Sequence, residues 1–359
     1  MTLQAATPLA QIESCREIPD KCGPADLAEQ AELAVGFLLD GRFLIGTPIS
    51  RGGMATIYRA EDMHDEGWAV AVKVPLPRYE RDPVYVARFL REEQIGRQLE
   101  HPFLLKFIST PEHKSRIYLV TELLSGCTLA YLMSKKRPLP ERDALGLASL
   151  VCEALHSMHE RNFIHRDIKP DNIMLCTDHT IRLMDFGLTA PITRRLDVLA
   201  DMAPVFGTPQ YMAPEQVKRT HCDARTDIYS LGVILYEMLT GKLPFEHEDP
   251  WVCAQSRVAG DPVAPRAINP AISPEAEEIV LHAMRRKPME RYPDAKEFQS
   301  DLGSPGKVKI TGLSERLRPP RWVLSYEQAQ VMTGVILSIV LVIALVGAFY
   351  FLAHLPGKR

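Results

Sequence analysis

Residues 163–172 read FIHRDIKPDN, and residues 184–187 read MDFG. The two stretches bring together two acids, Asp167 and Asp185, and an amide, Asn172. Transfer of a phosphoryl group needs an acid that orients a hydroxyl nucleophile, and oxygen ligands that hold Mg²⁺ against the nucleotide phosphates. Asp167 suits the first role, and Asn172 with Asp185 suits the second. The spacing therefore predicts a site for phosphoryl transfer.

These stretches resemble the catalytic and metal-binding loops of the protein kinase superfamily. The resemblance covers residues 38–302 and is closest to bacterial serine/threonine kinases of the eukaryotic-like (Hanks) type. It implies an α+β bilobal kinase fold, with a small β-rich N-lobe, a larger helical C-lobe, and a cleft for ATP and Mg²⁺ between them. It also implies that Lys169 lies near the γ-phosphate. A lysine at this position after Asp167 fits Ser/Thr rather than Tyr specificity.

Residues 50–57, SRGGMATI, fall between two strand-like stretches. Small residues let backbone N–H groups approach phosphate oxygens, although Gly-Gly also marks ordinary turns. The stretch resembles the kinase glycine-rich loop, with Ser50 and Ala55 in place of its first and third glycines. Both are small, so the cover over the phosphates should survive. The resemblance implies nucleotide contacts from Ser50, Arg51, Gly52, Gly53, Met54, Ala55, Ile57 and Ala71.

Lys73 follows in an apolar strand-like run, and a lysine in a buried strand needs an anionic partner. Glu92 is the candidate, on a helix predicted between Pro83 and Leu99. The pair would hold Lys73 against the α- and β-phosphates. Taken alone, Lys73 could be a solvated residue at a strand end, and Glu92 an exposed acid beside Glu93.

The resemblance also assigns the adenine pocket. It implies that Thr121 lies behind the base, and that Glu122 and Leu124 offer backbone hydrogen bonds to it. Residues 213–215, APE, resemble the end of a kinase activation segment, which positions protein substrates. In this family the glutamate pairs with a distant arginine.

By sequence context that pair is Glu215 with Arg291, and Asp227 would brace the catalytic loop. These three residues are structural in role, and together they indicate a complete kinase lobe.

Arg166, by family analogy, implies a pocket for a phosphate on the activation segment. Two hypotheses stay open. Either Thr193 is phosphorylated, or Asp197 or Asp201 pairs with Arg166 and activity is constitutive. Thr208 is a second candidate for phosphorylation, although contact with the substrate loop is its expected role.

Apolar patterns predict the elements around these motifs. An apolar stripe runs through Leu147, Val151, Ala154 and Met158. Gly241 is the expected stop of a buried helix that contains residues 228–236. Strands are expected at 43–45, 69–73 and 117–120, and further helices at 274–284 and 295–302.

The composition is that of a globular protein, with 46% apolar and 24% charged residues. The formal charge of −3 argues against a general nucleic-acid binder. The seven cysteines form no Cys-x-x-Cys pair, which fits reduced thiols better than disulfides or a zinc site.

Residues 331–352 contain no charge over 22 positions, long enough for a helix that crosses a bilayer. A buried core helix is the alternative. ATP use places the kinase domain in the cytoplasm, so the sequence predicts a single-pass protein of the cell membrane. Small residues at Gly334 and Ser338 are compatible with helix pairing and a homodimer. The predicted divisions are a flexible extension (1–37), the kinase domain (38–302), a juxtamembrane linker (303–328), a transmembrane helix (329–355) and a short outer tail (356–359).

An inert scaffold and a kinase of small molecules are the two alternatives to a membrane-tethered Ser/Thr protein kinase. An inert scaffold with a kinase shape would usually lack one of the residues Lys73, Asp167, Asn172 or Asp185, and all four are present. A kinase of small molecules is disfavoured by the APE segment.

Overall fold

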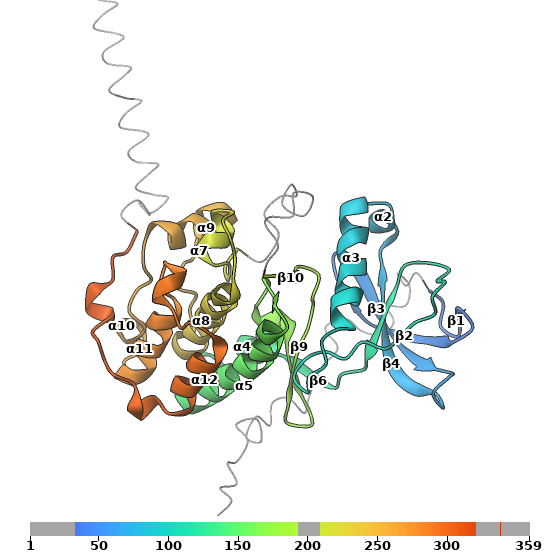
Figure 1. Ribbon diagram of the computed structural model, residues 1–359, viewed down its shortest axis with the longest axis horizontal. Helices are drawn as coiled ribbons and strands as arrows, with labels where there is room; N and C mark the ends of the chain where they lie inside the picture. Colours follow the sequence, from blue (N-terminus) through green and yellow to red (C-terminus); the bar gives the residue numbers. More distant parts are fainter. Residues whose placement is uncertain (1–32, 193–208, 321–337, 339–359) are drawn as a thin grey trace, which may run out of the picture.

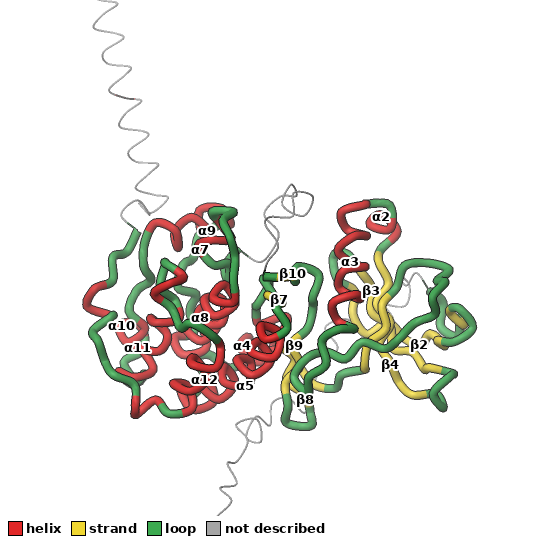
Figure 2. Tube along the Cα trace, in the orientation of Figure 1, coloured by secondary structure: helices red, strands yellow, loops and turns green. Residues whose placement is uncertain are grey.

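The computed structural model describes residues 33–192, 209–320 and Ser338. Two lobes stand side by side: a sheet-rich lobe from the first part of the chain, and a helical lobe from the remainder (Figure 1). Figure 2 shows the same division by secondary structure, with strands concentrated in one lobe and helices in the other. The predicted α+β bilobal architecture, with a β-rich lobe and a larger helical lobe, is therefore confirmed.

The N-lobe is an antiparallel sheet in the order β1-β2-β3-β4-β5. Its inner face buries β-branched and aromatic residues such as Tyr58, Val72 and Tyr118, each at most 1% exposed. The last strand begins and ends two residues later than predicted, at Leu119 and Glu122, and just before it the Tyr118 carbonyl accepts a hydrogen bond from the Lys114 ammonium. The strands are β1 (Leu38–Leu39), β2 (Phe43–Arg51), β3 (Ala55–Asp62), β4 (Trp68–Pro75) and β5 (Leu119–Glu122).

Helix α3 (Pro83–Gly96), preceded by the short α2 (Pro77–Glu80), packs against this sheet (Figure 1). Asp82 caps it by accepting hydrogen bonds from the backbone of Val84 and Tyr85. The helix predicted between Pro83 and Leu99 is present, ends at Gly96, and buries Phe89 and Glu92.

The close approach of α3 to the chain beside it requires glycine at residue 96. A Cβ at Gly96 would lie 2.3 Å from the ring of Phe107. Since no side chain fits there, Gly96 sets the distance of the helix from the loop that precedes β5.

The C-lobe is built around α5 (Glu141–Glu160) and α8 (Ala224–Thr240). The predicted stripe on α5 is buried, and α8 is buried on almost all sides. Helix α8 ends at Gly241, which adopts the left-handed φ of 73° expected of a glycine stop. The other helices of eight or more residues are α9 (Pro250–Ala259), α11 (Pro274–Ala283) and α12 (Ala295–Gly303). The short helices are α4 (Leu129–Lys135), α7 (Pro214–Val217) and α10 (Pro265–Ile268), with 3-10 turns η3 (Pro170–Asn172), η4 (Pro288–Glu290), η5 (Pro305–Lys307) and η6 (Ser314–Arg316).

Small strands at the junction of the lobes carry the two motifs. Strand β8 (Ile173–Cys176) pairs with β9 (Ile181–Leu183), and β6 (Gly126–Thr128) lies on its other side. Because the first motif ends where β8 starts, and the second begins where β9 ends, this hairpin sets them next to each other. Strand β7 (Phe163–Ile164) pairs with β10 (Ala190–Pro191) and fixes the start of the first motif.

Both ends of the described kinase region continue past the predicted boundaries. Leu33 is 7% exposed and donates its N–H to the Tyr58 hydroxyl, so the last residues of the predicted extension pack on the sheet. At the other end, residues of the predicted linker lie on the C-lobe. The Glu278 carboxylate accepts hydrogen bonds from Thr311 and Leu313. The linker is docked here because a buried acid receives its backbone.

In the two described ranges, 33–192 and 209–320, no helix has the length and apolar character needed to span a bilayer. The predicted transmembrane helix at 329–355 lies outside the described residues, apart from Ser338.

Candidate active site

Lys73 projects from β4 to α3 and donates to both carboxylate oxygens of Glu92, each Nζ–Oε distance being 2.8 Å. The Glu92 side chain is 7% exposed and the Lys73 side chain is 26% exposed, so the acid is shielded from water while the ammonium keeps one accessible side. Burial alone would lower the pKa of Lys73, but the negative charges of Glu92 and Asp185 outweigh it and raise the pKa above its ordinary value. The ammonium therefore stays charged and is held by α3 within the N-lobe, close enough to Asp185 to be affected by its charge.

The catalytic loop holds Asp167 by one carboxylate oxygen. Its Oδ2 accepts hydrogen bonds from Lys169 Nζ at 2.7 Å and from Asn172 Nδ2 at 3.1 Å. The same Nδ2 also donates to the Asp167 backbone carbonyl at 2.9 Å. In the described part of the chain these contacts use neither Asp167 Oδ1 nor the amide oxygen of Asn172, so both oxygens can still accept a hydrogen bond or bind a cation.

The second motif is tied to the first through its backbone. Met184 donates its N–H to the Asn172 carbonyl at 2.9 Å, and its own carbonyl contacts His165 Nε2 at 3.0 Å. Asp185 follows with a φ of 66°, a strained left-handed conformation for a residue other than glycine. In this conformation the Asp185 carboxylate lies over the following residues, and its Oδ1 accepts a hydrogen bond from the Gly187 N–H at 3.3 Å.

Asp185 lies close to the ion pair. A Cβ built on Gly187 would be 3.2 Å from Asp185 Oδ1 and 3.8 Å from Glu92 Oε2, so both acids face the same small space. Burial alone would raise the pKa of Asp185, yet the charges of Lys73 and Lys169 outweigh it and hold the pKa below its ordinary value. Asp185 is therefore a carboxylate at neutral pH.

Asp227, predicted as a brace, is completely buried at the start of α8. It accepts the backbone N–H groups of His165 and Arg166, both at 2.9 Å, and contacts His159 Nε2 at 2.8 Å. Burial opposes its ionisation, but the hydrogen bonds and charges of the histidines hold its pKa below its ordinary value. Arg166, with a φ of 68°, keeps its strained backbone because Asp227 binds its N–H.

The glycine-rich stretch is the turn between β2 and β3. The Gly52 N–H binds the Ala55 carbonyl at 2.9 Å, and Ser50 pairs with Ile57 across the strands. A Cβ on Gly53 would meet no atom within 4 Å, so the glycine leaves open space for a ligand to approach. Residues 50–54 are exposed, Ile57 is half-buried, and Ala71 is buried in β4.

The predicted adenine residues lie along β5 and the chain that follows it. Thr121 pairs with Ala71 of β4. The Glu122 N–H is already donated to the Lys106 carbonyl at 2.9 Å, and the Glu122 carbonyl accepts the Thr121 hydroxyl at 3.2 Å, so Glu122 can offer a base only the second lone pair of its carbonyl. In the described part of the chain, the N–H of Leu124 has no backbone acceptor. The structure therefore leaves one acceptor, at Glu122, and one donor, at Leu124.

The predicted pair of Glu215 and Arg291 is formed, with distances of 2.7 and 2.8 Å between Nη1 and Oε1 and between Nη2 and Oε2. Thr193, Asp197, Asp201 and Thr208 lie outside the described residues, so both hypotheses for control of the activation segment stay predictions.

Sequence reasoning did not identify several contacts around this site. Gln216 Nε2 donates to the Arg166 carbonyl at 2.8 Å, which joins the APE segment to the catalytic loop. Tyr211 donates to Glu237 at 2.7 Å. Arg257 on α9 donates hydrogen bonds to the backbone carbonyls of Gln210 and Met212, in the loop before α7. None of these partners is close in sequence, and no local pattern distinguishes them from surface residues.

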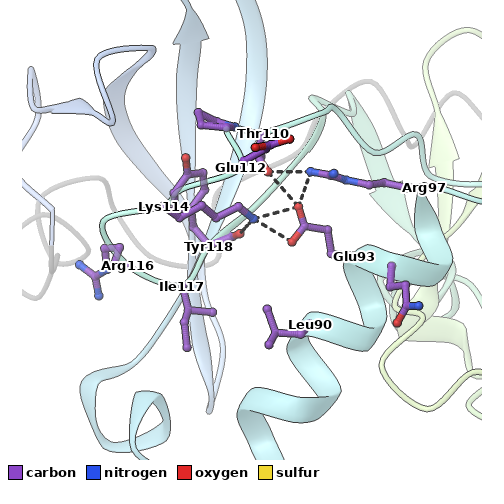
Figure 3. A pocket seen from close by; sticks show the side chains of 11 residues that line it. Leu90, Glu93, Arg97, Thr110, Glu112, Lys114, Arg116, Ile117 and Tyr118 are labelled. Carbon is purple, nitrogen blue, oxygen red and sulfur yellow. Dashed lines mark hydrogen bonds and ion pairs between the residues drawn. The ribbon is translucent and has the colours of Figure 1, made fainter.

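A separate cavity of about 660 Å³ lies on the other side of α3 (Figure 3). Glu93 occupies its centre, bound by Lys114, Arg97 and Thr110. None of the predicted site residues lines it. Glu92 and Glu93 thus fix two different faces of one helix, the first to the candidate site and the second to the chain before β5.

The sequence model of the protein kinase domain matches residues 43–301. The chain therefore belongs to the protein kinase domain family. It is 36% identical over 270 residues to "Serine/threonine-protein kinase PknB" of Mycobacterium leprae, a match that covers 74% of this chain and 43% of the relative. It is 39% identical over 269 residues to "Probable serine/threonine-protein kinase SCO3848" of Streptomyces coelicolor, a match that covers 74% of this chain and 40% of the relative.

These relatives confirm the predicted resemblance to bacterial Hanks-type serine/threonine kinases. The chain matches less than half the length of each relative, 43% and 40%.

Proposed function

We propose that this chain is a membrane-anchored protein kinase that transfers the γ-phosphate of ATP to Ser and Thr hydroxyls of protein substrates, itself included. The observation that carries the proposal is the Lys73–Glu92 ion pair beside Asp185, at the edge of a loop that holds Asp167 and Asn172. A cation, two acids and an amide in this arrangement meet the needs of phosphoryl transfer.

The donor set fits Mg²⁺. The Asp185 carboxylate and the Asn172 amide oxygen are hard oxygen ligands. Among the described residues, no group of three or more His, Cys, Asp and Glu side chains could hold a metal without other ligands. Mg²⁺ commonly binds one or two protein oxygens and takes its remaining ligands from phosphates and water. When bound, it would neutralise charge on the phosphates.

The protein's own groups then divide the work. Lys73, fixed by Glu92, binds phosphate oxygens of the nucleotide. Asp167 orients the substrate hydroxyl through Oδ1 and takes its proton as the new bond forms. Lys169, 2.7 Å from Asp167 Oδ2, offsets negative charge on the transferred group. The carbonyl of Glu122 and the N–H of Leu124 hold the base.

Transfer of ³²P from γ-labelled ATP to casein tests this proposal. Asp167→Asn should lower the rate about 10²- to 10⁴-fold, the usual range for loss of a positioned acid–base group. Asp171→Asn is the matched control, since Asp171 belongs to the same loop but is exposed. No transfer by the wild-type chain, or equal rates for wild type and Asp167→Asn, would refute the proposal.

The membrane anchor is supported by the uncharged run at residues 331–352. Its test is extraction of membranes from expressing cells at alkaline pH, which releases peripheral proteins. The wild-type chain should stay with the membrane pellet. A chain with both Leu341→Lys and Leu345→Lys should be released, because each lysine at the centre of a span costs about 2.5–3.5 kcal/mol. Release of the wild type would contradict the anchor.

A further inference from the structure

Arg257, on α9, is a completely buried cation, 0% exposed. Burial of a guanidinium costs several kcal/mol unless an acid or several hydrogen bonds compensate it. Arg291, also buried, has Glu215 as its partner. Within residues 33–192 and 209–320, Arg257 has no carboxylate partner, and its Nε is buried without an acceptor.

What Arg257 binds is the loop that precedes α7. Its Nη1 donates to the Gln210 carbonyl at 3.0 Å and to the Met212 carbonyl at 2.7 Å. Its guanidinium lies over the Phe245 ring, 5.6 Å from the centroid. Met212 also packs against Ala254 of α9. Helix α9 therefore holds this loop by an apolar contact and by two hydrogen bonds from one charge.

The other side of the loop is tied to the catalytic residues. The Gln216 amide accepts the Ala213 N–H at 2.9 Å and donates to the Arg166 carbonyl at 2.8 Å. Arg166 directly precedes Asp167. The loop from Gln210 to Ala213 therefore spans the distance between Arg257 and the catalytic loop.

The carbonyls of Gln210 and Met212, which face Arg257, also set the direction of the backbone N–H groups that follow them. In a trans peptide the C=O and the following N–H point in opposite directions. Because the Gln210 carbonyl faces Arg257, the Tyr211 N–H points away from α9. In the described part of the chain this N–H has no backbone acceptor. A bound polypeptide can offer a carbonyl to it.

We infer that Arg257 is a positioning residue for the protein substrate, which fixes the loop at residues 210–213 so that a bound polypeptide places its hydroxyl at Asp167. The inference rests on the proposed kinase function. An apolar side chain would fill the same space without the cost of a buried charge. The gain that offsets this cost is the fixed orientation of two carbonyls beside the catalytic loop.

The test compares two variants of the full chain. Arg257→Met keeps the length of the side chain and removes its charge and donors. Arg257→Lys keeps the charge but cannot reproduce the fixed fork of the guanidinium. Steady-state kinetics with casein and ATP should show a KM for casein raised about tenfold in Arg257→Met, the effect of losing hydrogen bonds from a charged donor. Arg257→Lys should show a smaller rise of about threefold.

In both variants the KM for ATP and the rate of the slow hydrolysis of ATP by water should stay within twofold of the wild-type values. Neither ATP binding nor ATP hydrolysis uses the loop at residues 210–213. Gln255→Ala, on the same helix, is the matched control and should resemble the wild type. An unchanged KM for casein in Arg257→Met would overturn the inference. So would an equal loss in casein phosphorylation and ATP hydrolysis, which would indicate general disruption.

Misfolding of Arg257→Met and inactivity of the wild type each require a different measurement. If Arg257→Met fails to fold, as judged by its thermal transition, the KM of Arg257→Lys decides. If the wild type itself phosphorylates nothing, the proposed function fails, and hydrogen exchange at residues 210–213 then tests the loop alone. Faster exchange at Tyr211 and Ala213 in Arg257→Lys is expected, and equal exchange would overturn the inference.

Discussion

Arg291 binds Glu215 through two hydrogen bonds across 76 residues of sequence, and both side chains are almost completely buried. The pair joins the end of the APE segment to the base of the C-lobe. Removal of one partner from a buried ion pair leaves an uncompensated charge, at a cost of about 3–5 kcal/mol. Arg291→Met should lower the free energy of unfolding by about that amount in urea titrations.

Arg285→Met provides the comparison for this prediction. Arg285 pairs with Glu290, but both side chains are partly exposed, at 32% and 36%. Loss of such a pair should cost less than about 1 kcal/mol. Similar losses in the two variants would show that burial of the Glu215–Arg291 pair has no special weight.

Lys73 and Lys114 both bind acids of α3, and only Lys73 does so inside the candidate site. Lys73→Met should lower kcat for phosphate transfer about 10²- to 10³-fold, because a fixed charge that meets the phosphates is lost. Lys114→Met should change kcat less than threefold, since Glu93 keeps hydrogen bonds from Arg97 and Thr110 (Figure 3). If Lys114→Met were as inactive as Lys73→Met, the position of α3 rather than the charge of Lys73 would be the important factor.

Stability should depend on pH through Asp227. Its pKa is lowered in the folded protein, so folding favours the ionised form. The stabilisation is complete above the unfolded pKa of about 3.9 and is lost as the pH falls through the lower folded value. The free energy of unfolding should therefore stay level with respect to this group from pH 7 to about 5 and decline below about pH 4.

Asp227→Asn isolates that contribution from the other acids. The difference in free energy of unfolding between wild type and Asp227→Asn should be constant near neutral pH and shrink below about pH 4. A difference that grows as the pH falls would mean that the pKa of Asp227 is raised in the folded protein.

Sequence patterns predicted the elements whose signals are local. The buried face of α3, with Phe89 and Glu92, follows from helical spacing alone, and the stop of α8 at Gly241 follows from the need for a left-handed residue. The catalytic loop was found because its acids and amide stand within a few residues of each other.

Contacts between segments that are distant in the sequence produce no comparable local sequence pattern. Arg257 has ordinary helical neighbours, and only the folded chain shows that it is buried against the carbonyls of residues 210 and 212. The prediction of a linker at residues 303–328 followed from Gly, Pro and basic residues, and the structure describes this segment as far as residue 320. The prediction missed the docking of this segment because Glu278, the acid that receives it, resembles any exposed helical glutamate in sequence.

Docking of that segment onto the C-lobe can be tested directly. Glu278 is 6% exposed and accepts the backbone N–H groups of Thr311 at 3.0 Å and of Leu313 at 3.2 Å. A second acid, Asp261, accepts the Arg318 N–H at 2.9 Å. In Glu278→Ala the amides of Thr311 and Leu313 should turn to water, and their hydrogen exchange should accelerate about tenfold or more, as expected for loss of hydrogen bonds to a charged acceptor.

The amide of Arg318 should keep most of its protection in Glu278→Ala, because Asp261 holds it independently, and the pattern should reverse in Asp261→Ala. Glu275→Ala, on the same helix, should leave all three amides unchanged. If Thr311 exchanges at the rate of an unstructured amide in the wild type, the segment is not docked in solution. If a single substitution exposes all three amides, the two acids hold one cooperative unit rather than two separate attachments.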